Sequence, residues 1–112
     1  MQLIIVESPS KAKTIEKYLG GKYKVDASGG HVRDLPEKRI GVNINKNFEA
    51  TYEISPDKKQ VIKRLSEKAA KADKIYLATD PDREGEAISW HLREALKLDR
   101  EKTYRIEFNE IS

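Results

Sequence analysis

Four short strand-like runs, two of them continuously apolar and all separated by helical patterns, constrain the fold of this 112-residue chain more than any other feature. The lengths of these runs are typical of strands, and they cover residues 3–6, 23–27, 75–79 and 104–108. Strands that alternate with helices are joined by crossover connections, which make the strands parallel. The sequence therefore predicts an α/β fold with a parallel core sheet of about four strands and helices on both faces.

Three helices are predicted between these strands. The first begins after Ser8 and ends at a glycine pair, the second begins after Ser55 with that residue as its cap, and the third carries an apolar stripe that starts at Ala87. Residues 33–55 are less regular. They are expected to leave the sheet as an excursion, with an outlying strand near residues 48–54.

Composition indicates a globular protein. Hydrophobic residues make up 38% of the chain and charged residues 37%, and the apolar residues form periodic clusters, which argues against disorder. No apolar run approaches the roughly 18 residues of a membrane span, so we expect a cytoplasmic protein without a membrane partner. The length fits one domain, residues 1–112. Because cysteine is absent, disulfides, thiolate zinc sites and cysteine nucleophiles are excluded.

A group of acids follows the third apolar run. Asp80, Asp82 and Glu84 are spaced two apart, so an extended chain would place their carboxylates on one side. Such carboxylates repel one another unless a cation lies between them. An alternative is that they only cap the following helix and complement the positive end of its dipole. Glu7 directly follows the first run, so a parallel sheet would bring it to the same edge as Asp80.

Oxygen ligands alone favour Mg²⁺ over zinc at this edge. A magnesium site there would serve phosphoryl transfer by neutralising phosphate charge. Glu7 stands apart from the other acids and is the candidate proton donor, kept protonated by the negative charge near it. Lys11 opposes the dipole of its helix, which suggests an anionic ligand, although a solvated lysine is the simpler interpretation.

Other polar residues give weaker signals. A glycine turn at residues 28–31 would let backbone amides approach an anion, with His31 beside them. The lysine-rich face of the second helix is expected to be solvated. Trp90 and His91 border the stripe of the third helix and are expected to pack there rather than bind a ligand. The net charge of +3 suits a polyanionic partner but is weak evidence for nucleic acid.

Four blocks of sequence together resemble the bacterial type IA DNA topoisomerase I family. They are LIIVESPSKAKTI (3–15), GHVRDLP (30–36), ATDPDREGEAISWHL (78–92) and RIEFNEIS (105–112). The first and third blocks are similar to the two halves of a Toprim domain, which consist of a glutamate, here Glu7, and an Asp-x-Asp-x-Glu motif. The resemblance spans nearly the whole chain and implies a Rossmann-like Toprim fold.

The resemblance also implies an isomerase activity that needs no ATP. Enzymes of this family relax negatively supercoiled DNA with Mg²⁺, through a single-strand break and a transient 5′-phosphotyrosine link. The magnesium ligands it implies are Glu7, Asp80, Asp82 and Glu84. Glu7 would also assist proton transfer to the leaving 3′ hydroxyl, and Lys11 would contact the scissile phosphate, supported by Arg83. Lys11, His31 and Arg33 would contact DNA.

The family's nucleophilic tyrosine belongs to a separate domain further along the polypeptide, and none of the five tyrosines here matches its motif. The chain is therefore expected to be the N-terminal Toprim fragment of a larger topoisomerase, monomeric and unable to cleave DNA alone. Its expected partners are single-stranded segments of supercoiled DNA and the downstream domains of the same polypeptide.

Three alternatives stay open. A Toprim nuclease or primase fragment would use the same acids, although the GHVRDLP and FNEIS blocks count against it. A receiver-like signalling domain also combines acids at strand ends with Mg²⁺ and a lysine, and Asp80 would be its phospho-acceptor. A metal-free binding module is the third.

Overall fold

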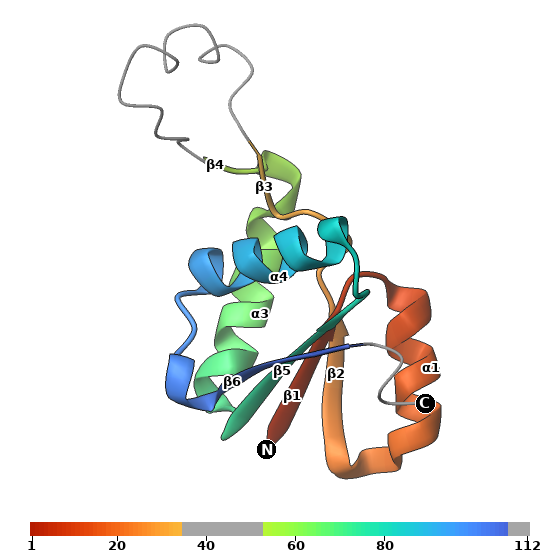
Figure 1. Ribbon diagram of the computed structural model, residues 1–112. Coiled ribbons are helices and arrows are strands. Elements are labelled where there is room, and N and C mark those ends of the chain that lie inside the picture. The colour runs from red at the N-terminus through yellow and green to blue at the C-terminus, as the bar shows by residue number, and fades with distance from the viewer. Residues whose placement is uncertain (35–52, 108–112) are drawn as a thin grey trace, which may run out of the picture.

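The computed structural model describes residues 1–34 and 53–107. Its centre is a parallel sheet of four strands in the order β2-β1-β5-β6 (Figure 1). The strands are β1 (Gln2–Val6), β2 (Tyr23–Ala27), β5 (Lys74–Thr79) and β6 (Thr103–Glu107). All four were predicted to within a residue at each described end. Phe108, the predicted last residue of β6, lies outside the described residues.

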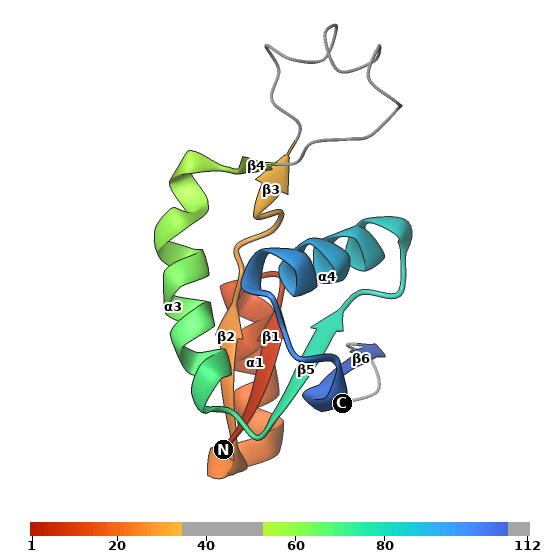
Figure 2. The ribbon, with the colours of Figure 1, turned by 90° about the vertical axis from the view of Figure 1, so that its left-hand side faces the viewer.

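Helices cover both faces of the sheet, as predicted. Helix α1 (Pro9–Leu19) lies on one face, and α3 (Lys59–Lys71) and α4 (Arg83–Leu96) lie on the other (Figures 1 and 2). Within the described parts of the chain, no helix is long and apolar enough to cross a membrane.

Alternation along the strands divides the core into two layers. The buried strand residues that pack with α3 and α4 are Leu3, Ile5, Ile75 and Leu77. Those that pack with α1 are Ile4, Val6, Ala27 and Ala78. Successive side chains of a strand point to opposite faces, so a strand covered on both sides must be apolar throughout. The continuous run at residues 3–6 has this cause.

The predicted helix starts are correct for α1 and partly wrong for α3. Ser8 caps α1 by accepting a hydrogen bond from the Lys11 amide at 3.3 Å, and Gly20 ends the helix with φ +63°. Ser55 makes no side-chain cap. Its carbonyl instead accepts from the Lys58 amide at 2.8 Å, which forms a 3₁₀ turn over residues 56–58, and α3 begins only at Lys59.

The expected excursion from the sheet contains a small antiparallel ladder. Strand β3 (Arg33–Asp34) pairs with β4 (Glu53–Ile54). The predicted outlying strand at 48–54 is thus confirmed at its last two residues, and the remainder of that prediction lies outside the described residues.

Candidate functional site

The strand order creates a topological switch point between β1 and β5. From β1 the chain continues through α1 to β2 on one side, and from β5 it continues through α4 to β6 on the other. Ligands of open α/β sheets bind at such a point, beyond the carboxyl ends of the strands. Glu7 follows β1 and Asp80 follows β5, and the Asp80 amide donates to Glu7 Oε1 at 2.9 Å. The predicted meeting of these two acids is confirmed.

Lys11 lies between the two acids. Its Nζ is 3.0 Å from Glu7 Oε1 and 2.6 Å from Asp80 Oδ2. Burial of the ammonium opposes its charge, but the hydrogen bonds to Asp80 and Glu7 outweigh burial and raise the pKa of Lys11 above its usual 10.5. The interpretation of Lys11 as a solvated lysine is therefore wrong, and a cation already joins the two halves of the site.

Asp82 and Glu84 do not continue an extended chain, so that expectation is wrong. Asp82 is the N-cap of α4, and its Oδ1 accepts from the Gly85 amide at 2.7 Å. Glu84 lies in the exposed first turn of the helix. The capping interpretation holds for Asp82, because its bond satisfies an amide that the helix leaves without a partner. Among the described residues, no group of three or more acidic or histidine side chains is arranged to hold a metal ion.

Gly85 allows the first turn of α4 to lie against the end of β5. A Cβ at this position would be 1.9 Å from the Asp80 carbonyl oxygen. The Thr79 hydroxyl donates to the Gly85 carbonyl at 2.7 Å and lies 2.8 Å from the Ser89 hydroxyl, and both hydroxyl residues are buried. This packing role of Gly85 depends on contacts that the sequence does not reveal.

Arg105, to which the sequence assigned no role, fastens the same turn. Its guanidinium donates to the carbonyls of Thr79 at 3.2 Å and Asp80 at 3.0 Å, and to Glu86 Oε1 at 2.8 Å. Arg105 is in register with Leu77 across β5 and β6. The one sequence feature that could have indicated this role is the presence of an arginine within a run that is otherwise typical of a strand. It positions the backbone that carries Asp80.

Two backbone amides of the glycine turn after β2 form hydrogen bonds within the chain, although the sequence predicted that this turn would bind an anion. The Ser28 amide donates to the Val6 carbonyl and the Gly30 amide to the Glu7 carbonyl, each at 2.9 Å. Gly29 and Gly30 adopt φ of +75° and +99°, which glycine tolerates best. These two amides hold the end of β1, so the prediction that the turn offers them to an anion is wrong for both.

The remaining predicted site residues lie in different surroundings. His31 is exposed, and its ring centroid is 6.0 Å from that of His91, which is buried as expected. Arg83 is exposed in the first turn of α4. Arg33 begins β3, but its side chain is outside the described part. Trp90 is 39% exposed, and its ring lies edge-on to that of His91, with centroids 4.8 Å apart.

The acidic donors fit a hard divalent cation. All of them are carboxylates, and two already converge on one cationic group, the Lys11 ammonium. The Asp80 side chain is 38% exposed, which leaves room for water and phosphate ligands. Mg²⁺ is commonly bound by a few carboxylates together with such ligands, and does not need a closed protein cage.

The fold and this site define a Rossmann-like α/β domain with an acidic, lysine-bridged switch point. The family described as "Toprim domain" matches residues 2–111, and the chain belongs to this family. A solved structure of full-length topoisomerase I from Thermotoga maritima is similar, with a TM-score of 0.84 and 44% sequence identity. The match covers 98% of this chain and 19% of that one, so the chain spans about a fifth of its relative.

Proposed function

We propose that this chain is the metal-binding catalytic Toprim domain, residues 1–112, of a type IA DNA topoisomerase. As part of a longer polypeptide in the cytoplasm, it would relax negatively supercoiled DNA by cleaving and rejoining one strand. The observation that carries the proposal is the convergence of Glu7, Lys11 and Asp80 at the switch point. The 44% identity to a topoisomerase I favours this reaction over Toprim nucleases, primases and receiver-like domains.

Mg²⁺ would neutralise phosphate charge at this site. The proposed ligands are Glu7, Asp80, Asp82 and Glu84. Asp82 can serve as both cap and ligand, because its bond to Gly85 uses only Oδ1. Charge neutralisation of the acids would free Lys11 to bind the scissile phosphate, supported by Arg83.

Glu7 is the proposed proton donor to the leaving 3′ hydroxyl. The sequence suggested that negative charge alone would surround Glu7, but the Lys11 ammonium lies 3.0 Å from its Oε1. The Asp80 amide, which donates to Glu7 Oε1, instead fixes the orientation of the carboxylate. His31 and Arg33 are proposed DNA contacts.

The attacking tyrosine would come from another domain of the longer polypeptide. Three tyrosines of this chain form an edge-to-face and stacked series across the sheet, with centroids 6.3 Å apart for Tyr23 and Tyr76 and 5.5 Å apart for Tyr76 and Tyr104. Such packing explains them without a chemical role. The isolated chain is accordingly proposed to be a monomer that does not cleave DNA.

Calorimetric titration with Mg²⁺ tests the metal site. Asp80→Asn should weaken binding by about tenfold or more, because one charged ligand is lost. Asp57→Asn, an exposed acid in the 3₁₀ turn before α3, is the matched control and should bind as the parent chain does. Equal affinity of the Asp80 variant and the parent would exclude the metal assignment.

Exchange of domains tests the reaction. This chain would replace the matching segment of the Thermotoga maritima topoisomerase I, and supercoil relaxation would be measured with Mg²⁺. We expect relaxation by the chimera and loss of it with Glu7→Gln or Asp80→Asn. A folded chimera, verified by its melting transition, that leaves DNA supercoiled would contradict the proposal.

A further inference from the structure

We propose that a cavity on the outer side of α4 is a second subsite for DNA, which binds one base of a single strand against Trp90 and its phosphate between Arg93 and Arg100. The choice of DNA rests on the proposed function. The site itself lies outside the acidic switch point and contains none of the residues assigned to metal or proton transfer.

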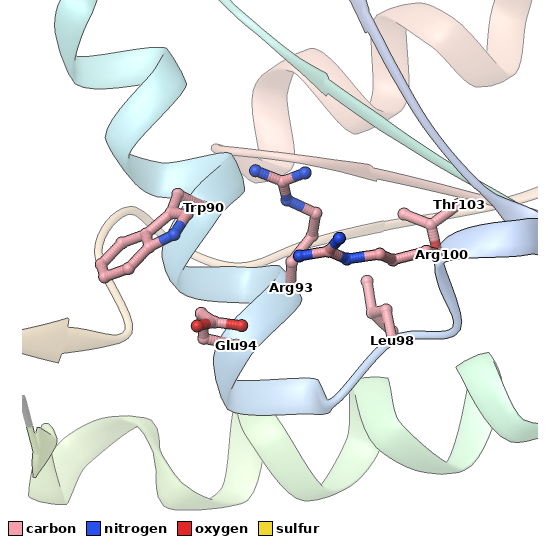
Figure 3. Close-up of a pocket in the computed structure, with 6 residues that line it drawn as sticks. All are labelled: Trp90, Arg93, Glu94, Leu98, Arg100 and Thr103. Carbon is pink, nitrogen blue, oxygen red and sulfur yellow. The ribbon is translucent and has the colours of Figure 1, made fainter.

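The cavity has a volume of about 360 Å³. Its lining residues are Trp90, Arg93, Glu94, Leu98, Arg100 and Thr103. Figure 3 shows Arg100 extending toward α4, where Arg93 and Trp90 lie, with the nitrogen-bearing edge of the indole facing the arginines in this view. The two guanidinium groups thus supply several hydrogen-bond donors at one space, as a phosphate requires.

Charge at the cavity favours an anion. Arg93 and Arg100 are both exposed, and neither forms an ion pair within residues 1–34 and 53–107. Among the described lining residues, Glu94 is the one acid, against two arginines. By contrast, Arg64 and Arg105 elsewhere on the surface are each paired with a carboxylate. Two guanidinium groups that share a cavity repel each other until an anion binds between them.

Trp90 adds a surface that an anion alone does not need. It is 39% exposed, whereas the apolar stripe of the same helix is buried at Ile88 and Leu92. An exposed indole beside basic groups is the usual combination in proteins that bind single strands, because every base can stack on it. A carboxylate-bearing protein segment would satisfy the arginines but gives no reason for a partly exposed indole beside them.

The position of the cavity connects it to the proposed cleavage site. Arg83 and Trp90 are seven residues apart on α4, which places them on the same side of the helix, separated by about 10 Å along its axis. Between them, Glu86 is paired with Arg105 and so does not present an unpaired negative charge. A single strand that leaves the switch point along this side of α4 would reach the cavity.

The chain contains one tryptophan, so its fluorescence reports on this cavity alone. The test titrates a short oligothymidylate into the full chain in EDTA and records both tryptophan emission and the anisotropy of a labelled oligonucleotide. We expect quenching that saturates together with the anisotropy. EDTA removes the metal, so a failed magnesium proposal would leave this result unchanged.

Matched variants separate stacking from general charge. Arg93→Gln with Arg100→Gln should weaken binding about tenfold more than Lys63→Gln with Lys71→Gln, two exposed lysines of α3 that remove the same charge. The slope of log affinity against log salt should fall by about 0.7, because the one phosphate bound between the two arginines is no longer neutralised. Trp90→Ala should weaken binding about tenfold. Unchanged unfolding midpoints would verify that the variants are folded.

Three results would overturn the proposal. The first is anisotropy that saturates without any change in tryptophan emission. The second is equal binding by the arginine and lysine double variants. The third is quenching by polyglutamate as strong as that by oligothymidylate, which would make the cavity a contact for an acidic protein segment instead.

Discussion

The two strand-to-helix junctions at the switch point follow the same plan with opposite charge. Each has an acid close to the strand end, Glu7 or Asp80, and then a capping residue that accepts a hydrogen bond from the amide three positions on. In the first junction that third residue is Lys11, and in the second it is Gly85. The first therefore places a cation at the switch point, and the second is followed by further acids in the first turn of its helix.

The junctions also differ in what fixes them. Backbone hydrogen bonds hold the first, where the Gly30 amide donates to the Glu7 carbonyl. Side chains and close packing hold the second, through Arg105 and the contact of Gly85 with Asp80. Because backbone bonds survive most substitutions, the second junction should be the more sensitive of the two.

The largest expected effect is at Gly85, the third position after the Asp82 cap. Gly85→Ala would place a Cβ 1.9 Å from the Asp80 carbonyl oxygen, and overpacking of this kind should lower the free energy of unfolding by about 3 kcal/mol. Gly21→Ala is the control, since its Cβ meets no atom within 4 Å. Urea unfolding measures both. Similar stabilities for the two variants would show that the turn shifts easily.

Removal of the hydrogen bonds made by the Arg105 guanidinium should have the next largest effect on stability. Arg105→Gln loses the bonds to the carbonyls of Thr79 and Asp80 and the pair with Glu86, which should cost about 2 kcal/mol of unfolding free energy. Arg105→Lys keeps the charge and should recover part of that loss. Urea unfolding of the three proteins tests this, and a Gln variant as stable as the parent would count against a brace.

Cap substitutions compare the junctions directly. Asp82→Ala should cost about 1.5 kcal/mol and Ser8→Ala about 0.7 kcal/mol, because the Asp82 bond is shorter, at 2.7 Å against 3.3 Å, and carries a charge. Asp82→Asn preserves the cap and should change stability by only a few tenths, about 0.3 kcal/mol. Thermal unfolding at matched concentrations ranks the three. If Asn destabilises as much as Ala, the charge rather than the cap is required.

The smallest effect should be a pH dependence of the first junction. The pKa of Lys11 is higher in the folded chain than its usual 10.5, so its stabilisation is complete below that value and is lost as the pH rises through the folded pKa. Unfolding free energies measured across alkaline pH should therefore converge for the parent and Lys11→Met. The exposed Lys13→Met, which removes the same charge from the same helix, is the control.

The sequence predicted what depends on apolar pattern and chain direction. Continuous apolar runs predicted β1 and β5. Their parallel arrangement in the sheet brings Glu7 and Asp80 together. The prediction from sequence was wrong where a single residue ends the extended backbone and begins a helix. Asp82 begins a helix, so the regular spacing of the acids does not place them on one side. The exposure of a side chain also depends on tertiary contacts, which the sequence does not show. An apolar stripe does not show whether a neighbouring element covers Trp90.

The strand order has a consequence for folding. Glu7 and Asp80 are 73 positions apart, and each belongs to a local β-α-β unit that can form from nearby residues. The site therefore exists only after the two units have docked along β1 and β5, a late and entropically costly closure. Because the cost of closing a loop grows only with the logarithm of its length, the chain between the units can gain residues at little expense to the site.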